Sequence, residues 1–397
     1  MVTQNPSGPV ALKCPQCNGD LPLTTLDAII CPYCGSSLIL GRSQPGAPNA
    51  PSGETLVHGL RLKPLTCTDD QGTRLPLFRM LIPAGWQFQG GCRWQLDNPG
   101  MPAVVQFLVA NPQGAEAFEV LPNMNFVWNN SPLSRVLFPA GSRYFGAEVR
   151  PPVSIADAFH SFILPRFRGA AQGLQIESIT PLPDLPRLVK SDAAITPGGS
   201  AEGGKARVRY SLQGQDFEEE FYGVVEVFRV PGGSLLSPSE FIVWFIDYLF
   251  SFRAAAGRLD ATADLFTVMI QSFELNPEWY AAFKTIVQHM AQRQITHIRH
   301  IGEIGNILAE AGRQMREQNL SDWYRRQDIY DRLAVDRSRA IRDVDGFYDP
   351  HREEVVELPS GYGHAWANNL GEYILTEDSS FNPNLYSTQH WEPMTQQ

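Results

Sequence analysis

The stretch "ARVRYSLQGQDFEEEFYGVVEVFRV", residues 206–230, decides the fold that this sequence predicts. Apolar and polar residues alternate along part of it, which is the period-two pattern of β-strands, so we expect two strands here. The apolar run "FIVWFIDYLFSF" at 241–252 is aromatic and β-branched, and it predicts a further, buried strand. Apolar residues at helical spacing come late, at 260–273. Strands followed by helices predict an α+β fold, in which helices pack on an antiparallel sheet.

The composition limits the classes of function. The chain has 397 residues, of which 43% are hydrophobic and 19% are charged, and its formal net charge is -10. Such a chain is globular and long enough for two or three domains, and its acidic balance makes nucleic-acid binding an unfavoured function. The first residues, "MVTQNPSGPVALKCP", lack a basic segment followed by an apolar run, and the run at 241–252 is too short for a membrane helix. We therefore expect no membrane span and a cytoplasmic, bacterial protein.

Two Cys-x-x-Cys pairs, "CPQCNG" and "CPYCG", lie near the start of the chain and predict a metal site. Cys14, Cys17, Cys31 and Cys34 can place four thiolates tetrahedrally around one ion. Four protein ligands close the coordination sphere, so the ion would be one structural Zn²⁺. Iron in the same geometry and dithiol redox chemistry are the alternatives. The pattern resembles the zinc-ribbon (rubredoxin-like) family over residues 12–40.

The chain divides into five parts in this interpretation: a zinc ribbon at 1–42, a flexible Pro/Gly-rich linker at 43–56, an α+β domain at 57–276, a long helical segment at 277–345, and a small β-meander with a polar tail at 346–397. In the third part, "IPAGWQFQGGCRW" (82–94) and "LDATADLFTVMIQSFELNPEW" (259–279) resemble the Mog1/PsbP-like family. That resemblance implies an α+β module that binds partners without catalysis. The last part resembles segments that end uncharacterised bacterial proteins.

The helical segment carries an apolar heptad pattern from Phe283 to Met315, which is typical of a coiled coil. A continuous helix over 277–318 would be roughly 60 Å long. Gln294 and His297 interrupt the apolar positions, and we interpret them as a polar layer that fixes register. The sequence leaves open whether this helix pairs within the chain or between chains.

The sequence contains no motif of a known catalytic class, and we assign no catalytic residue. Cys67 and Cys92 lack a nucleophile signature, and the carboxylates of Glu218, Glu219 and Glu220 are expected to alternate between the two faces of a strand. The glycine-rich "GSAEGGKA" at 199–206 falls in a predicted mobile loop. We therefore expect a non-catalytic adaptor or scaffold that docks a protein partner or self-assembles through the ribbon and the long helix. The alternatives are a hydrolase with its site in the α+β domain, or a weak RNA binder.

Overall fold

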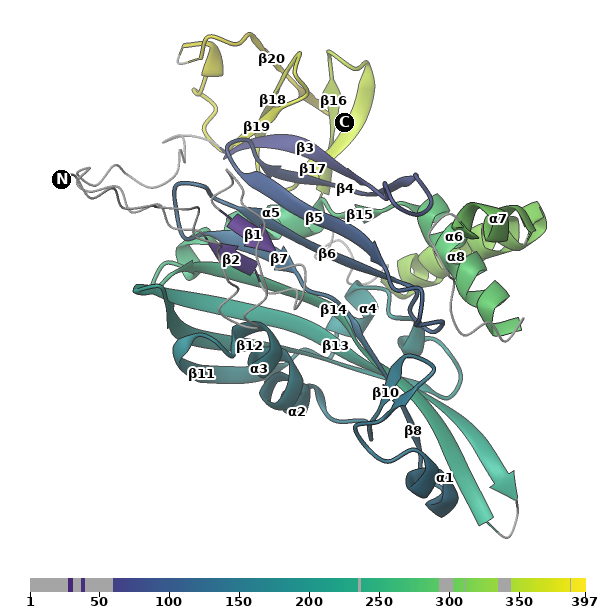
Figure 1. The fold of residues 1–397 in the computed structure, drawn as a ribbon. Coiled ribbons are helices and arrows are strands. Elements are labelled where there is room, and N and C mark those ends of the chain that lie inside the picture. Colours follow the sequence, from purple (N-terminus) through teal and green to yellow (C-terminus); the bar gives the residue numbers. More distant parts are fainter. Residues whose placement is uncertain are drawn as a thin grey trace, which may run out of the picture.

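Figure 1 shows the computed structural model, which describes residues 28–30, 37–39, 60–234, 237–292, 303–310, 312–334, 344–385 and 387–397. Most of the residues in regular structure belong to β-strands, and large antiparallel sheets form the body of the molecule. The predicted α+β class with a long C-terminal helical segment is therefore wrong. Helices are the smaller part of the regular structure in the described ranges, and none is long and apolar enough to cross a membrane.

The largest sheet has ten strands in the order β11-β12-β13-β14-β7-β6-β5, and β8 also pairs with β14 and carries β10 and β9 beside it. Its strands are β5 (Gln87–Trp94), β6 (Ala103–Ala110), β7 (Ala117–Val120), β8 (Met124–Asn129), β9 (Arg143–Tyr144), β10 (Ala147–Val149), β11 (Gln172–Pro181), β12 (Gly199–Leu212), β13 (Gln215–Ser234) and β14 (Ser237–Ala255).

The long hairpin of β13 and β14 is the axis of this sheet. The strands predicted within 206–230 and 241–252 are confirmed as parts of β12, β13 and β14. The aromatic run is buried as expected, because Trp244 and Ile246 are fully inaccessible to solvent. Beyond its pairing with β8, which ends at Phe241 opposite Asn129, the hairpin extends as a two-stranded ribbon (Figure 1).

The glycine-rich segment at 199–206 is not a loop, contrary to the prediction, because β12 begins at Gly199. A Cβ atom on Gly203 would lie 2.7 Å from the carbonyl oxygen of Leu182, and one on Gly204 would lie 3.1 Å from the side chain of Ile155. Glycine here allows a helix and a turn to pack directly on the strand. The glycines thus serve close packing rather than a mobile or phosphate-binding loop.

A second sheet joins the two halves of the chain. Its order is β15-β4-β3-β19-β18-β20, so strands from the C-terminal segment pair directly with β3, and a three-stranded sheet, β17-β16-β21, lies beside it at the top of Figure 1. The three strands predicted in the C-terminal segment are present, but they form no meander: β18 and β19 pair with each other and β19 with β3, whereas β17 pairs with β16 in the other sheet. The strands are β3 (Leu60–Thr68), β4 (Pro76–Pro83), β15 (Glu274–Leu275), β16 (Val344–Asp349), β17 (Glu354–Pro359), β18 (His364–Asn368), β19 (Tyr373–Thr376), β20 (Trp391–Pro393) and β21 (Thr395–Gln396).

The region predicted as one long helix contains α6 (Pro277–Gln292), α7 (Glu303–Glu310) and α8 (Gly312–Ala334). In a straight helix, two residues 34 positions apart would be separated by about 50 Å. Instead the Asn319 amide donates a hydrogen bond of 3.1 Å to the Thr285 hydroxyl, and the Tyr280 and Trp323 rings are 4.7 Å apart. The chain therefore reverses, and α8 packs antiparallel against α6. Gln294 and His297 lie outside the described residues.

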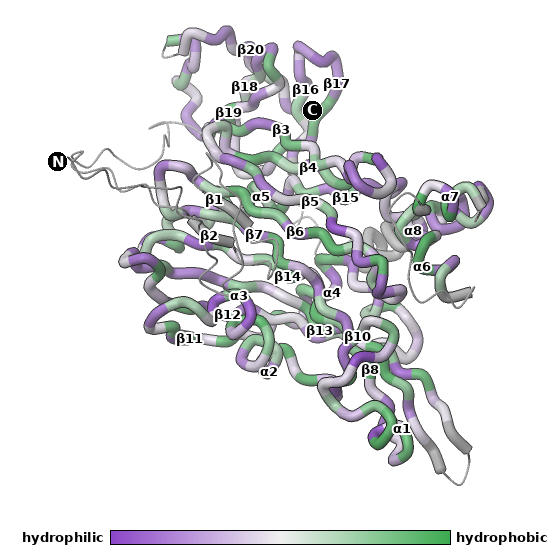
Figure 2. Tube along the Cα trace, viewed as in Figure 1, coloured by the Kyte–Doolittle hydropathy of each residue, from purple (hydrophilic) through white to green (hydrophobic). Residues whose placement is uncertain are grey.

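The main core lies between the two sheets, where apolar strand residues meet α5 (Ala263–Gln271) and α6. Phe78 of β4 stacks on Phe107 of β6 with ring centroids 4.7 Å apart, and Met269 and Ile286 complete the contact from the helices. A second core lies under α2 (Ile155–Ala158), the π-helical turn Phe159–Ile163 and α3 (Leu164–Arg168), which cover the opposite end of the large sheet. Figure 2 shows these interior strands as predominantly hydrophobic.

Candidate binding site

The four predicted zinc ligands, Cys14, Cys17, Cys31 and Cys34, lie outside the described residues. The short strands on either side of the second pair are described: β1 (Ala28–Ile30) pairs antiparallel with β2 (Ser37–Ile39). In the sequence, Cys31 and Cys34 fall between these two strands. In the described part of the chain, no group of three or more His, Cys, Asp or Glu side chains could hold a metal ion.

The three consecutive glutamates alternate between faces as predicted. Glu219 is fully buried and accepts two hydrogen bonds from Arg168, whereas Glu218 pairs with Arg207 on the other face. Glu220 bonds to Lys205 at 3.0 Å. All three carboxylates therefore have cationic partners, and the arrangement is that of a structural ion network.

The two isolated cysteines are poor candidates for nucleophiles. Cys67 is buried in β3 and Cys92 is half-buried in β5. Burial, reinforced by the nearby Asp70 and Asp69 carboxylates, raises the pKa of Cys67 to about 11. Burial and the charge of Asp69 also raise the pKa of Cys92. Because the thiolate is the reactive form, neither side chain is activated at neutral pH.

A carboxyl cluster lies where the 3-10 turn Asp192–Ala194 meets β13, β14 and α6. Glu226 accepts hydrogen bonds from the Ser191 hydroxyl and the Ala193 amide, and Asp192 is 3.2 Å from the Lys284 amine. Burial and the neighbouring Glu226 raise the pKa of Asp247 to about 7. The hydrogen bonds and ion pair of Glu226 and Asp192 come from within the fold and indicate no ligand.

Exposed apolar side chains gather at one end of the molecule, around α1 (Pro132–Leu137) and the ribbon of β13 and β14. Figure 1 shows this end lying opposite the C-terminal strands. Half of the exposed large hydrophobic side chains that the structure describes belong to it. We call them the apolar tip: Leu133, Val136, Leu137, Phe138, Phe145 and Val230.

Helix α1 begins at a capping residue, but its apolar face is exposed to solvent instead of packing on the protein. The Ser131 side chain caps it by accepting a hydrogen bond of 3.1 Å from the Ser134 amide, and Pro132 occupies the first turn. Leu133, Val136 and Leu137 share one face at spacings of three and four, yet they are 69%, 78% and 61% exposed. No residue of α1 is buried. An apolar helical face normally packs against a core, so this face is available to a partner.

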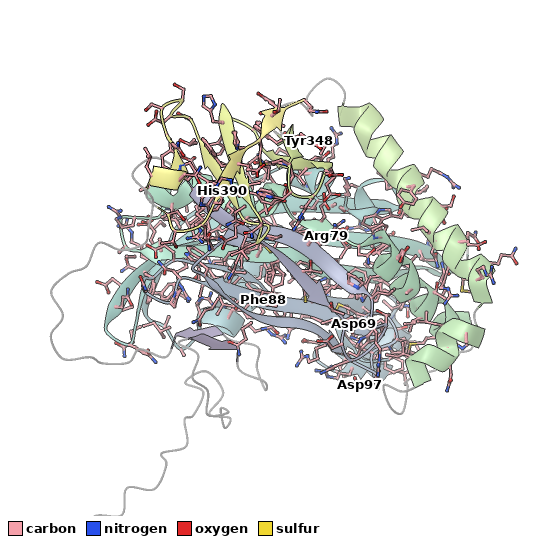
Figure 3. The ribbon with its side chains drawn as sticks, turned by 90° about the horizontal axis from the view of Figure 1, so that it is seen from above. Asp69, Arg79, Phe88, Asp97, Tyr348 and His390 are labelled. Atoms are coloured by element: carbon pink, nitrogen blue, oxygen red, sulfur yellow. The ribbon has the colours of Figure 1, made fainter. Side chains whose placement is uncertain are left out.

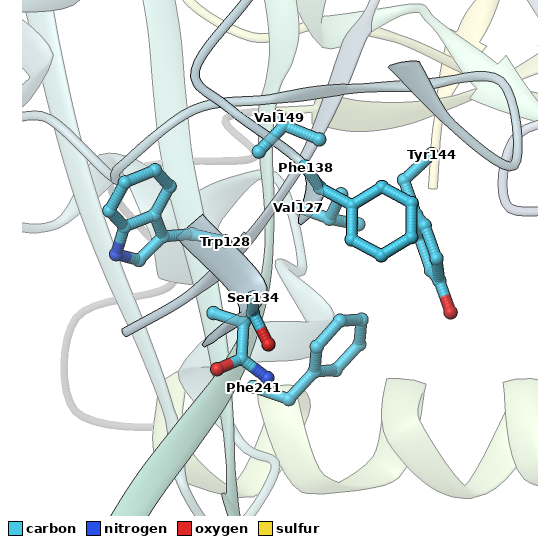
Figure 4. Close-up of a pocket in the computed structure, with 8 residues that line it drawn as sticks. Val127, Trp128, Ser134, Phe138, Tyr144, Val149 and Phe241 are labelled. Atoms are coloured by element: carbon cyan, nitrogen blue, oxygen red, sulfur yellow. The ribbon is translucent and has the colours of Figure 1, made fainter. Parts of the chain in front are cut away.

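A hollow of about 120 Å³ opens beside α1 (Figure 4). The Phe138 and Tyr144 rings pack edge to face at 4.9 Å on one side of it, and Trp128 lies on the opposite side. Asn129 and Ser134 supply its polar atoms. Its apolar lining comes from Val127, Trp128, Phe138, Tyr144, Val149 and Phe241.

The backbone next to the hollow is held in an unusual conformation. Phe145 has φ 47°, a left-handed value that is rare for an aromatic residue, and its side chain is 54% exposed. The turn is fixed by the Arg143 guanidinium, which donates a hydrogen bond of 2.9 Å to the Gly146 carbonyl. A Cβ atom on Gly146 would lie 2.7 Å from the Asp97 carbonyl oxygen, so only glycine fits there. The fold therefore maintains local strain while displaying an aromatic ring to solvent.

The tip segment at 130–150 has more arginines than carboxylates, and Glu240 of β14, whose backbone bonds to Asn130, lies next to it. Residues 130–150 contain three arginines and one glutamate, whereas the whole chain has a net charge of -10. Glu148 pairs with Arg150 at 2.5 Å. Arg135 and Arg143 are exposed and form no ion pair with a described residue. The tip thus combines apolar side chains with two exposed arginines that have no ion-pair partner among the described residues.

Reasoning from the sequence missed this site. The signal available was "NNSPLSRVLFPAGSRYFG" at 129–146, in which a capped apolar helix is followed by a Pro-Ala-Gly turn. Periodicity identifies the apolar face of such a helix, but it does not tell which side of the face is protein and which is solvent. Only the position of α1 beyond the end of β8 shows that its apolar face is uncovered.

Comparisons with known proteins leave the family open. No family model and no curated protein matches the chain. One solved structure, described as the crystal structure of LpqN involved in cell envelope biogenesis of Mycobacterium tuberculosis, is 13% identical, with a TM-score of 0.20, over 54% of this chain and 92% of that chain. A likeness of this size carries no argument about fold or function. The resemblances to the zinc-ribbon and Mog1/PsbP-like families stay predictions.

Proposed function

We propose that this protein is a non-catalytic adaptor that docks a protein partner through the apolar tip. The observation that supports it most strongly is the solvent-facing apolar side of α1, formed by Leu133, Val136 and Leu137. Contiguous exposed apolar surface is uncommon on proteins that act alone, and it marks interaction sites. The helices α6 and α8 pack on each other within the chain, which favours the apolar tip over these helices as the docking element. A cytoplasmic location and the hydrolase and RNA-binding alternatives stay predictions.

Substitutions in the apolar tip test directly whether a partner binds there. In the double variant Val136→Asp/Leu137→Asp, a charged carboxylate replaces each apolar side chain that a partner would bury. We expect an unchanged melting temperature, since both side chains are largely exposed, and loss of the stoichiometric partner. The measurement is native mass spectrometry of the full chain purified from its own host.

The matched control is Leu370→Asp/Leu385→Asp, which alters two side chains of 64% and 71% exposure in the C-terminal segment. This control should keep the partner. The proposal fails if the tip variant keeps the partner as well as wild type does, or if both double variants lose it equally.

We further propose that the N-terminal segment binds one structural Zn²⁺ through Cys14, Cys17, Cys31 and Cys34. The spacing of the two Cys-x-x-Cys pairs supports this, and the second pair falls in the sequence between the paired strands β1 and β2. The ion would fix the fold of a small second docking module, since structural zinc sites supply folding energy directly.

Zinc binding is expected to depend on the four cysteines of the two Cys-x-x-Cys pairs and not on Cys67 or Cys92. Purified chain should contain one zinc ion, and Cys31→Ser/Cys34→Ser should remove it, because two thiolates do not retain a structural ion. Elemental analysis by plasma mass spectrometry measures this. Cys92→Ala is the control and should keep the metal. Iron in place of zinc, or zinc retained by the double variant, would contradict the assignment.

A further inference from the structure

We propose that the apolar tip takes an acidic linear segment of a partner protein, with one apolar side chain of that segment seated in the hollow beside α1. This inference rests on the proposed function and names the chemistry of the partner. Two observations carry it: the size and lining of the hollow, and the two exposed arginines next to its lining residues.

The hollow fits a single side chain. Its volume of about 120 Å³ is close to that of the roughly 150 Å³ apolar cavities that bind benzene. Aromatic rings from Trp128, Tyr144 and Phe241 line it, and such surfaces gain most from burying another apolar group. Asn129 and Ser134 offer polar atoms to the backbone of the segment that carries the anchor. A central anchor in a pocket is the usual energetic centre of a protein interface.

Two arginines near the hollow favour a partner segment of negative charge. Arg135 follows the lining residue Ser134 in α1, and Arg143 precedes the lining residue Tyr144 in β9, so two different elements bring an arginine next to the hollow. Both are exposed, and neither is neutralised by an ion pair with a described residue. Asp or Glu side chains beside the anchor would pair with them, whereas Lys or Arg would be repelled. Such complementarity sets the choice of partner and the rate of encounter.

A second copy of this chain fits the same surface poorly. In a two-fold dimer the tip would meet itself, so Arg135 and Arg143 of both copies would enter one interface without added negative charge. An anionic lipid surface matches the charge but does not fill a hollow of this size, and α1 has only six residues to insert. An acidic segment with an apolar anchor satisfies both the charge and the shape.

The test uses two synthetic fluorescein-labelled peptides and the full chain. Both peptides have one central Leu; one has flanks of Asp, Glu and Ser, and the other has Lys in place of every acidic residue. We expect the acidic peptide to bind at least about tenfold more tightly by fluorescence anisotropy. The variant Arg135→Glu should remove this preference and leave the fold intact, since Arg135 is exposed and the hydrogen bond from Arg143 to Gly146 is kept. A second variant, Val149→Phe, should fill the hollow and weaken binding of the acidic peptide. An acidic peptide with Ser in place of Leu should bind weakly.

The outcomes separate this inference from the proposed function. Equal binding of both peptides, or preference unchanged by charge reversal, overturns the acidic-segment inference. Binding of the tip to vesicles of phosphatidylglycerol without peptide binding assigns it to a lipid surface and overturns the inference. The inference is also overturned if light scattering shows a dimer that is lost when Val136 and Leu137 are replaced. If the peptides do not bind but Val136→Asp/Leu137→Asp still loses the native partner, the proposed function stands and this inference fails. If that variant keeps the partner, both fail.

Discussion

Replacing Arg168 with Met is expected to lower the free energy of unfolding by about 3–5 kcal/mol, the cost of leaving buried carboxylates without their cation. The guanidinium of Arg168 is 4% exposed and bonds to Glu219 at 2.6 and 2.8 Å and to Glu119 at 2.7 Å. Glu219 also accepts a hydrogen bond of 2.7 Å from the Tyr210 hydroxyl. Burial alone would raise the pKa of Glu219, but the charge of Arg168 and its hydrogen bonds hold it below its ordinary value.

Urea unfolding followed by tryptophan fluorescence measures this loss. The matched control is Arg166→Met, two residues earlier in α3, where the side chain is exposed and the change should stay within about 0.5 kcal/mol. Arg253 lies opposite Glu219 in the β13–β14 register and stays charged nearby, so the loss should fall toward the lower end of the range. Equal stability of the two variants would show that the buried network contributes no more than a surface arginine.

Replacing Asp69 with Ala is the second change with a large expected effect, about 4 kcal/mol, because one buried carboxylate satisfies donors from three parts of the fold. Asp69 lies in the turn between β3 and β4, on the side of the helices (Figure 3). It accepts hydrogen bonds from the backbone of Gly72 and Thr73 at 2.9 Å. It also accepts from the Trp94 and Trp279 indoles at 3.0 Å, and these rings are buried.

Asp69→Ala leaves two indole N–H groups buried without their acceptor and detaches the start of α6 from the β3–β4 turn. Asp70→Ala is the control, since this neighbouring carboxylate is exposed. Thermal unfolding at pH 7 should separate the two variants by many degrees. If Asp69→Ala is destabilised no more than Asp70→Ala, the hydrogen bonds that Asp69 accepts contribute little to the stability of the fold.

The same carboxylate makes stability depend on pH in a defined direction. Burial would raise the pKa of Asp69, but hydrogen bonds from Thr73, Trp94, Trp279 and Gly72 outweigh it and lower the pKa. A depressed folded-state pKa contributes stability above the unfolded value near 4, and the contribution is lost as the pH falls through the folded-state pKa. The difference between wild type and Asp69→Ala should therefore shrink below about pH 4.

Local sequence patterns were sufficient to predict the strands, but not to predict which strands pair with each other. The aromatic run that became β14 and the strands at 354–376 are recognisable because alternation and turn residues are local signals. Pairing of β19 with β3 joins residues more than 300 positions apart, and no local signal encodes it. The ion network depends equally on distant residues, since Arg168 and Glu219 meet only after the sheet has formed.

The long helix was mispredicted for a related reason. A heptad pattern shows that a helix has an apolar face, but the same pattern arises when two short helices pack on each other. Asn319 decides between these here: its buried amide exchanges hydrogen bonds with Gln288 at 3.1 and 3.2 Å, which fixes α8 against α6. The apolar tip escaped detection because exposure is a property of the assembled fold, not of the segment that contains α1.

The most direct test of the docking surface is photo-crosslinking in the protein's own host from a benzoylphenylalanine at position 136, with position 385 as the control. Val136 and Leu385 are 78% and 71% exposed, and they belong to α1 and to the C-terminal segment, which lie at opposite ends of the molecule (Figure 1). The account predicts one dominant protein adduct from position 136, absent from position 385 and abolished by adding Leu133→Asp and Leu137→Asp. The same adducts from both positions, or none from position 136, would contradict it.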